Sequence, residues 1–438
     1  MCSSDLGRGV SDPTAPFDRS LAPPAVLTAD LEALAAAHGT PVYVYDEDAI
    51  RARCREYLAA FGAGHVAFAA KSFLCTAMAR LVQEEGLQID CASGGELHVA
   101  LHGGIPAAAV TLHGNNKSDD ELRRALVAGV GRIVADSDDE LDRLERLAAE
   151  LGVRPRVLVR VTPGVEAHTH EFIETGTEES KFGFTVSDGI ALAAAVRVAT
   201  SPLLTLGGLH CHIGSQIWLL DSYARAVEVV LDLVVEIAAA TGTQVEDLVL
   251  GGGLGARYLS EDPEMSIVEY AKVLHDAVAT GSAARGIAAP AVHVEPGRSI
   301  VAAAGATLYR VGTVKTIPGV GTYVAVDGGM SDNPRPVLYG AGYEAYLPAR
   351  VDEARPLAVR IAGKHCEQGD LVVADGHLPE GVAPGDLLVT PVTGAYGHSM
   401  ASNYNKVPRP AVVFLRDGEA RLVVRRETDD DLLRLDVD

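Results

Sequence analysis

One lysine, Lys71, stands at the end of the apolar run His65-Val66-Ala67-Phe68-Ala69-Ala70. A short apolar run between turn-forming residues and a helical pattern predicts a buried strand, from whose C-terminal end Lys71 would project into a largely apolar setting. Desolvation there would favour the neutral amine, which is the nucleophilic form. Lys71 is therefore a candidate for covalent chemistry, although most lysines at strand ends are ordinary surface residues.

Three consecutive glycines, Gly251-Gly252-Gly253, follow another apolar run. Successive backbone N–H groups in such a run, together with a nearby helix N-terminus, can bind a phosphate group. A glycine run is also the usual sequence of a tight turn. Both interpretations stay open at this point.

The segment Glu295-Pro296-Gly297-Arg298 places a carboxylate and a guanidinium on one short turn. The two groups could simply pair with each other. Near a pyridine ring, Glu295 could instead keep the ring nitrogen protonated, which makes the ring an electron sink. Arg298 could then bind a substrate carboxylate through two hydrogen bonds.

Two histidines alternate in His210-Cys211-His212, so both imidazoles would lie on one face of a strand. Such a pair could bind a metal, but no acidic or cysteine ligands accompany it at a convincing spacing, and we predict no metal. His212 could instead stack on a flat cofactor. His210 lies deeper in the strand and could be an ordinary core histidine.

These residues fall at the ends of strands in a regular alternation. Helical patterns, one of them opened by the capping box Ser118-Asp119-Asp120-Glu121, separate apolar strand patterns at 65–71, 87–92, 109–113, 132–136, 156–161, 206–213, 247–250 and 291–295. Eight such units over about 230 residues predict a (β/α)8 barrel, with a doubly wound open sheet as the alternative. Functional residues of a barrel lie at the C-terminal ends of its strands, where Lys71, the glycine run and Glu295 fall.

The pattern changes after residue 300, where strand patterns continue without regular helices as far as a hairpin at 411–424. They predict a C-terminal all-β domain, which an early strand at 41–45 could join. We expect a flexible tail at 1–24, a segment that packs with the β domain at 25–46, the barrel at 47–300 and the β domain at 301–438. A short helix is expected at 28–38, with Thr28 or Asp30 near its N-terminal cap.

Composition excludes several classes of partner. The chain has 438 residues, of which 48% are hydrophobic, and a net charge of −22 speaks against a nucleic-acid or anionic-membrane partner. Its six cysteines form no Cys-x-x-Cys pair, which fits a reducing compartment. No signal peptide is expected, because the first twenty residues lack a hydrophobic h-region. No membrane span is expected, because the apolar stretch at 226–240 is interrupted by acidic residues. We therefore expect a cytoplasmic protein.

A lysine amine, a phosphate-binding glycine run, a carboxylate for a ring nitrogen and a stacking histidine together describe a pyridoxal-phosphate site. Ordered motifs between about residues 41 and 410 resemble the fold-type III pyridoxal-phosphate decarboxylases, and among them the diaminopimelate decarboxylases. The segments that carry the resemblance are Ala69-Ala70-Lys71-Ser72, Asp90-Cys91-Ala92-Ser93-Gly94-Gly95-Glu96, His212-Ile213-Gly214-Ser215-Gln216, Gly251-Gly252-Gly253, Glu295-Pro296-Gly297-Arg298, Cys366-Glu367-Gln368-Gly369-Asp370 and Gly394-Ala395-Tyr396.

The resemblance implies two catalytic residues and a set of cofactor contacts. Lys71 would hold pyridoxal phosphate covalently, and Cys366 would return a proton after CO2 is lost. His212 would stack on the ring and Glu295 would bind its nitrogen. The complete set of implied cofactor contacts is Lys71, Asp90, His212, Ser215, Gly252, Gly253, Glu295, Gly297, Arg298 and Tyr396.

The resemblance also implies a substrate and an assembly. Meso-2,6-diaminopimelate would be converted to L-lysine and CO2, as the last step of lysine biosynthesis, in a homodimer whose second subunit supplies Cys366 and Glu367. Two arginines suit a substrate with two carboxylates, and an acidic residue suits its distal ammonium. The implied substrate contacts are Arg298, Arg335, Tyr339, Glu367 and Tyr396.

Some alternatives remain open. A decarboxylase of ornithine or arginine, or a catalytically inactive homologue that binds pyridoxal phosphate, would share most of these motifs, and a racemase fits less well because a carboxylate at the ring nitrogen favours a strong electron sink. The loop at 166–183 also resembles the diaminopimelate enzymes. Mild departures at Ala70-Lys71-Ser72-Phe73 and at Gln368 concern fine geometry and not the chemistry.

Overall fold

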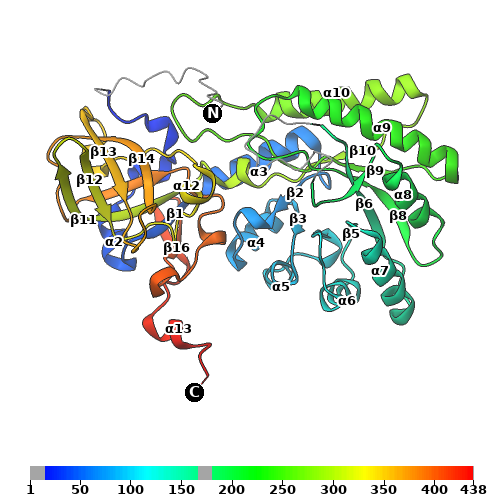
Figure 1. Ribbon diagram of the computed structural model, residues 1–438, viewed down its shortest axis with the longest axis horizontal. Helices are drawn as coiled ribbons and strands as arrows, with labels where there is room; N and C mark the ends of the chain where they lie inside the picture. Colours follow the sequence, from blue (N-terminus) through cyan, green and yellow to red (C-terminus); the bar gives the residue numbers. More distant parts are fainter. Residues whose placement is uncertain (1–14, 166–179, 438) are drawn as a thin grey trace. The chain divides into compact units, whose positions relative to one another are not determined.

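The computed structural model describes residues 15–165 and 180–437 (Figure 1). The chain forms two compact units, which we call the barrel unit and the β unit. The barrel unit consists of residues 51–255 and 265–299. The β unit takes in the residues up to 50, the segment 256–264 and the chain from residue 300 onward.

Eight parallel strands form the sheet of the barrel unit, in the order β10-β9-β8-β6-β5-β4-β3-β2. A parallel bridge between Val66 and Val294 joins the two edges, so that the sheet nearly closes. The expected barrel is thus confirmed. The strands are β2 (Ala67–Ala69), β3 (Gln88–Cys91), β4 (Val110–Leu112), β5 (Arg132–Ala135), β6 (Arg156–Thr162) with a short partner β7 (Phe184–Thr185), β8 (Thr205–His210), β9 (Asp247–Val249) and β10 (Ala291–His293).

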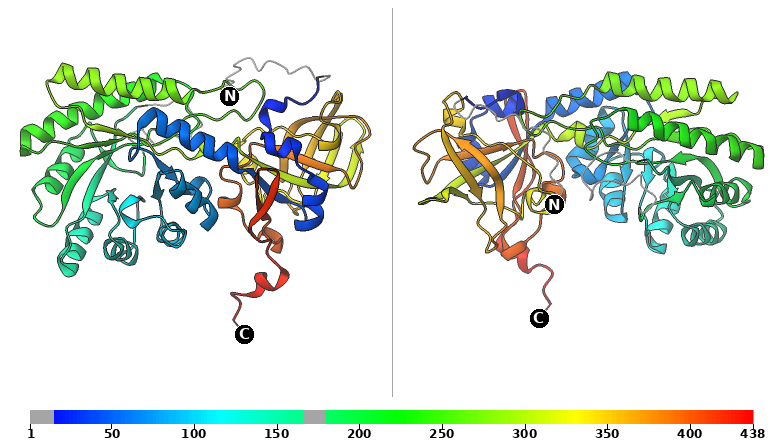
Figure 2. Two further views of the ribbon diagram at one scale, coloured as in Figure 1. Left: turned by 180° about the vertical axis from the view of Figure 1, so that it is seen from behind. Right: turned by 45° about the horizontal axis from the view of Figure 1, so that its top comes forward.

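Helices connect successive strands of the barrel, and the local sequence explains where several of them begin. Ser118 and Glu121 form the expected capping box at the start of α6. Figure 2 shows the two longest helices, α9 and α10, running side by side. The helices are α3 (Glu47–Phe61), α4 (Thr76–Glu84), α5 (Gly94–His102), α6 (Asp119–Ala128), α7 (Asp138–Leu151), α8 (Ile190–Thr200), α9 (Asp221–Thr241), α10 (Ile267–Arg285) and α11 (Arg298–Val301).

The β unit is built on one sheet in the order β14-β13-β12-β11-β1-β16-β17, with β15 paired to β11. The N-terminal strand β1 lies between β11, to which it is antiparallel, and β16, to which it is parallel. The early strand therefore joins the C-terminal domain, as expected. The strands are β1 (Val42–Asp46), β11 (Gly305–Ile317), β12 (Gly321–Val326), β13 (Leu357–Ala362), β14 (Leu371–Leu378), β15 (Leu387–Pro391), β16 (Ala411–Arg416) and β17 (Glu419–Val424).

Short helices of the β unit show two differences from the expectation. The helix expected at 28–38 is present but begins later, as α2 (Leu31–His38), and Asp30, one of its two expected caps, caps it. A separate short helix, α1 (Pro24–Thr28), precedes it, with an extended Ala29 between the two. A short helix, α12 (Arg335–Tyr339), also interrupts the strands, and α13 (Asp429–Leu433) follows them.

Two segments differ from the expected domain bounds. Residues 15–24 fall in the expected flexible tail, yet Phe17 is buried and stacks on Tyr346 with ring centroids 4.3 Å apart. Residues 256–264 fall in the expected barrel range but belong to the β unit, where Arg257 pairs with Asp18 at 2.7 Å. No helix in the described ranges has the length and apolarity needed to cross a membrane.

Candidate functional site

Lys71 lies just beyond the first barrel strand. The strand β2 ends at Ala69, earlier than expected, and Lys71 sits in a 3-10 turn, Ala70–Ser72. The Ser72 hydroxyl donates to the Ala69 carbonyl at 2.8 Å and fixes this turn. The expected apolar burial of Lys71 is wrong, because its side chain is exposed. The exposed side chain leaves the amine accessible to a reactant.

Two carboxylates lie within electrostatic reach of Lys71. Asp90, at the end of β3, is buried, and burial raises its pKa to about 7, with Glu295 adding to the rise and His113 and Lys71 opposing it. Burial also raises the pKa of Glu96, again against the charge of Lys71. Asp90 can therefore hold or release a proton near neutral pH, next to the lysine.

Glu295 is the centre of a buried network that includes two histidines. His113 Nε2 lies 2.9 Å from Glu295 Oε1, and His210 Nε2 lies 3.0 Å from Oε2. His113 Nε2 is also 3.3 Å from Asp90 Oδ1. Burial alone would raise the pKa of Glu295, but the two histidines hold it well below its usual value. Glu295 is therefore an ionised carboxylate in a low-dielectric setting.

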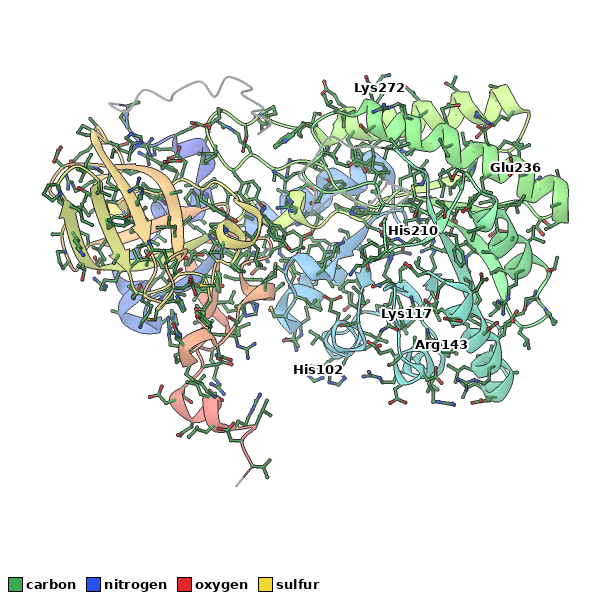
Figure 3. The ribbon with its side chains drawn as sticks, viewed as in Figure 1. His102, Lys117, Arg143, His210, Glu236 and Lys272 are labelled. Atoms are coloured by element: carbon green, nitrogen blue, oxygen red, sulfur yellow. The ribbon has the colours of Figure 1, made fainter. Side chains whose placement is uncertain are left out.

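The two histidines of this network differ in protonation. Burial lowers the pKa of His210 to about 4, so its ring is neutral. Burial would lower the pKa of His113 as well, but Asp90 and Glu295 outweigh it and raise that pKa above its usual value. Figure 3 labels His210, which lies in the barrel unit. His113, His210 and Glu295 have the donor atoms of a metal site, within 4.8 Å of one another, but here they satisfy each other.

His212 lies two residues beyond the end of β8, next to the glycine run. The Gly252 N–H points to His212 Nδ1 at 3.4 Å, and a Cβ added at Gly251 would meet the same ring. Burial and the charge of Lys71 hold the pKa of His212 well below its usual value. Its imidazole is therefore neutral, as stacking against an electron-poor ring requires.

The glycines make a close-packed backbone cradle. A Cβ at Gly253, whose φ is +106°, would meet the Gly214 carbonyl and come within 2.9 Å of the Tyr223 hydroxyl. A Cβ at Gly252 would meet the Glu295 carbonyl, and one at Gly297 would come within 2.9 Å of Ser72 Oγ. Only glycine fits these positions, because the segments after β8, β9 and β10 approach one another so closely.

Arg298 and Ser215 meet at the same end of the barrel. Arg298 is buried, and its Nη2 donates to Ser215 Oγ at 2.9 Å. The hydrogen-bond partners of Glu295 described above are His113 and His210. The barrel unit thus brings together nine of the residues that the sequence assigns to cofactor binding, namely Lys71, Asp90, His212, Ser215, Gly252, Gly253, Glu295, Gly297 and Arg298.

The remaining assigned residues all belong to the β unit. Arg335, the first residue of α12, is buried, and its Nη1 donates to the Tyr343 hydroxyl at 2.6 Å. Its guanidinium carbon lies 4.7 Å from the centre of the Tyr258 ring. Tyr339, at the end of the same helix, is half-buried. The aromatic rings hold the Arg335 guanidinium in one orientation.

Cys366 and Glu367 lie on an exposed turn between β13 and β14. Cys366 is the exposed one among the five cysteines that the structure describes, and all five are free thiols. Tyr396 follows β15 with a φ of +64°, which L side chains rarely adopt. Backbone strain at this half-buried tyrosine is typical of functional sites.

Sequence reasoning missed one member of the barrel network, His113. The His113 ring meets the ring of His210, with centroids 4.6 Å apart. The available signal was a polar residue at the end of a predicted strand.

Most of the loop at 166–183 lies outside the described residues. At the end of this loop, the Gly183 N–H donates to Asp136 Oδ1 at 2.8 Å.

The donor set of the barrel unit fits pyridoxal phosphate. A glycine cradle with Ser215 and Arg298 suits the phosphate, and an exposed lysine suits the aldehyde carbon. An ionised Glu295 suits a protonated ring nitrogen, and each carboxylate oxygen has a second lone pair besides the one that faces a histidine. The neutral ring of His212 suits the face of the cofactor.

Comparisons with known proteins agree with this geometry. Residues 47–302 match the family model described as the pyridoxal-binding domain of pyridoxal-dependent decarboxylases. Diaminopimelate decarboxylase from Mycobacterium tuberculosis is 50% identical over 416 residues, which cover 93% of this chain and 93% of that protein. The same enzyme from Bacillus subtilis is 48% identical, over 92% of this chain and 93% of that protein.

Solved structures give the same result. The crystal structure of diaminopimelate decarboxylase from M. jannaschii, in complex with L-lysine, matches with a TM-score of 0.86 and 34% identity. The match covers 93% of this chain and 94% of that one. The Helicobacter pylori enzyme, also in complex with L-lysine, matches with a TM-score of 0.85 and 32% identity, over 93% of this chain and 99% of that one.

Proposed function

The chain belongs to the diaminopimelate decarboxylases, a family of pyridoxal-dependent decarboxylases, and we propose that it converts meso-2,6-diaminopimelate to L-lysine and CO2. One observation carries the proposal. At one end of the barrel, an exposed lysine, an ionised carboxylate, a neutral imidazole and a glycine cradle converge, and each matches one part of pyridoxal phosphate. The two relatives described above, which align with this chain over most of its length, are both named diaminopimelate decarboxylase.

The residues of the barrel unit would bind the cofactor and manage its charge. Bound pyridoxal phosphate supplies a protonated ring that takes up the electron pair of the broken bond to CO2. Lys71 would hold the cofactor covalently and yield its place to the substrate amine. Glu295 would keep the ring nitrogen protonated, while His212 would lie against the ring face. Asp90, with its pKa of about 7, would exchange a proton with the Lys71 amine.

The residues of the β unit would complete substrate binding and protonation. Arg335 would bind the distal carboxylate, and Glu367 the distal ammonium, of a substrate that carries both groups. Tyr339 and Tyr396 would add contacts, with Arg298 binding from the barrel. The Cys366 thiol would deliver a proton to the carbon that has lost CO2.

The proposal includes a homodimer with shared active sites, in which Cys366 and Glu367 come from the second subunit. Both side chains lie on an exposed turn, which suits a role in the active site of the other subunit. We place the enzyme in the cytoplasm, because the five described cysteines are free and a catalytic thiol must stay reduced.

The decisive experiment measures CO2 and L-lysine released by the purified holoenzyme from meso-diaminopimelate. We expect equal amounts of both, and ornithine or arginine should compete poorly. CO2 release from ornithine in preference to diaminopimelate would show that ornithine is the substrate. No release from either compound would indicate an inactive homologue. Arg335→Ala should weaken diaminopimelate binding far more than ornithine binding, because only the former has a second carboxylate.

A further inference from the structure

A buried carboxylate, Asp370, closes the turn that carries Cys366 and Glu367, and the chemistry above gives it no role. Asp370 is 3% exposed, whereas Cys366 and Glu367 are exposed. It lies directly before β14, at the point where the chain re-enters the sheet. A carboxylate at such a depth needs hydrogen-bond donors on both oxygens.

The donors to Asp370 come from two different segments. Its Oδ1 accepts from the Met330 N–H at 2.6 Å. Its Oδ2 accepts from the His365 N–H at 2.9 Å and lies 2.8 Å from His365 Nδ1. Met330 belongs to the segment 327–335, which leads into Arg335. His365 directly precedes Cys366. One carboxylate therefore joins the segment of Arg335 to the turn of the cysteine.

The backbone around Asp370 is shaped for this contact. A Cβ at Gly329, whose φ is +148°, would lie 2.6 Å from both Asp370 oxygens, and a Cβ at Gly363 would also meet the carboxylate. The Lys364 N–H donates to the Gly328 carbonyl at 2.8 Å, which adds a main-chain bond between the same two segments. Glycine at these positions lets the main chain approach the carboxylate closely.

Each segment is also fixed on its far side. Asp332 accepts from the Gly329 N–H at 2.6 Å and from the Tyr309 hydroxyl at 2.7 Å, which anchors the Arg335 segment to β11. The Cys366 N–H donates to Asn405 Oδ1 at 2.9 Å. The main chain at Cys366 is thus held on both sides while the thiol itself stays exposed.

We propose that Asp370 is a positioning residue that fixes the Arg335 segment and the Cys366-Glu367 turn relative to each other. In the proposed homodimer, loss of this tie would disturb substrate binding by Arg335 in one active site and proton delivery by Cys366 in the other. The inference rests on the proposed function, in which Arg335 binds a carboxylate and Cys366 donates a proton. It goes beyond that function because Asp370 is buried and its carboxylate is bound by Met330 and His365 of its own chain.

Asp370→Asn is the sharpest test variant, because it keeps the shape and removes one acceptor. An asparagine side chain offers a single acceptor oxygen, so it can satisfy the Met330 side or the His365 side but not both. Asp375→Asn is the matched control. Asp375 is exposed on the same strand, β14. Its substitution by asparagine makes the same chemical change at a position away from the contacts of Asp370.

Steady-state kinetics of the holoenzymes separate positioning from general damage. Asp370→Asn should lower kcat and raise KM for meso-diaminopimelate, each by about tenfold, the usual effect of losing a hydrogen bond to a charged group. Cys366→Ala should lower mainly kcat, and Arg335→Ala should raise mainly KM. Asp375→Asn should match the wild type. An Asp370→Asn enzyme with wild-type kcat and KM would overturn the inference.

Hydrogen exchange gives a readout that does not depend on turnover. In Asp370→Asn, amides at 328–335 and at 363–370 should lose protection together, while the rest of the β unit keeps it. Unchanged protection in both segments, or a loss spread over the whole unit, would contradict a positioning role. If the wild type releases no CO2, the proposed function fails, and the exchange experiment still decides whether Asp370 ties the two segments.

Discussion

The buried carboxylates of the two units have different hydrogen-bond partners. In the barrel unit, Glu295 and Asp90 face the imidazoles of His113 and His210, groups that themselves gain and lose protons. In the β unit, Asp332 and Asp370 accept from main-chain N–H groups of their own neighbourhood, besides the Tyr309 hydroxyl at Asp332 and the His365 ring at Asp370. The first arrangement lets protons move during a reaction. The second arrangement fixes the path of the chain.

This contrast suggests a division of labour. Carboxylates with titratable partners adjust the protonation of a cofactor ring and of an amine, so the barrel unit would carry the electronic part of the reaction. Carboxylates with main-chain donors hold loops at defined positions, so the β unit would carry the geometry of substrate recognition. Five substitutions test this comparison.

The largest effect is expected for Lys71→Ala in the barrel unit. The variant should abolish turnover and the absorbance near the visible edge that a lysine-bound cofactor gives, because no amine remains to hold the cofactor. Absorbance spectra and CO2 release measure both. Lys272→Ala, at an exposed lysine on α10, is the control and should behave as the wild type. Retention of the absorbance band in Lys71→Ala would place the covalent link elsewhere.

Glu295→Gln should come next. It keeps the shape but removes the charge that faces His113 and His210, and turnover should fall on the order of 10²–10³-fold, as for other preorganised electrostatic groups. The pKa of His113 should also fall, because Glu295 helps to raise it. A pH–rate profile and histidine titration by NMR measure both effects. An unchanged His113 titration would show that the network is not coupled.

Lys117→Met tests a buried ion pair of the barrel unit. Lys117 Nζ lies 2.8 Å from Glu140 Oε1 and also donates to the Gly114 and Val134 carbonyls, and both side chains are almost fully buried. Removing the lysine leaves an unpaired buried carboxylate, which should destabilise the protein by about 3–5 kcal/mol in chemical denaturation. Adding Glu140→Leu should recover most of the loss.

The β unit offers the matched contrast to this pair. Arg409 and Glu427 form an ion pair in which the arginine is 46% exposed. Arg409→Gln should cost about 1 kcal/mol or less, as is usual for surface pairs. A loss as large as that of Lys117→Met would contradict the assignment of Arg409–Glu427 as a surface pair.

The last effect concerns Asp332, and it depends on pH. Burial raises the pKa of Asp332 to about 7 in the folded protein, well above the usual value of an unfolded aspartate. Its contribution to stability is therefore complete below about pH 4 and is lost as the pH rises through 7. Relative to Asp332→Asn, the wild type should lose on the order of a few kcal/mol between pH 4 and 7. A pH-independent difference in denaturation midpoints would contradict this.

The sequence predicts much of the fold because local signals repeat. Segments rich in β-branched and other apolar residues, such as 156–161, indicate buried parallel strands, and the capping box at Ser118 marks a helix start that the structure confirms. Asp30 was one of two expected caps, and the separate short helix that ends at Thr28 was missed. The short turn after β2 was also missed, and with it the exposure of Lys71.

The site is predicted less completely than the fold. Types and spacings identify Lys71, Glu295 and the glycine run as candidates, and the resemblance to a family supplies their roles. Contacts between distant segments leave no local signal. Neither the bond from His113 to Glu295 nor the tie from Asp370 to Met330 follows from residues near in sequence, because tertiary packing alone creates both.

The glycines around the β-unit carboxylates have a consequence for mutational tolerance. A Cβ at Gly328 would lie 2.6 Å from an Asp332 oxygen, and Cβ atoms at Gly329 and Gly363 would meet Asp370. At Gly381 and Gly385, in contrast, an added Cβ would meet nothing within 4 Å. In a library of single substitutions, the first group should be depleted even for alanine, and the second should tolerate asparagine, which accepts a positive φ.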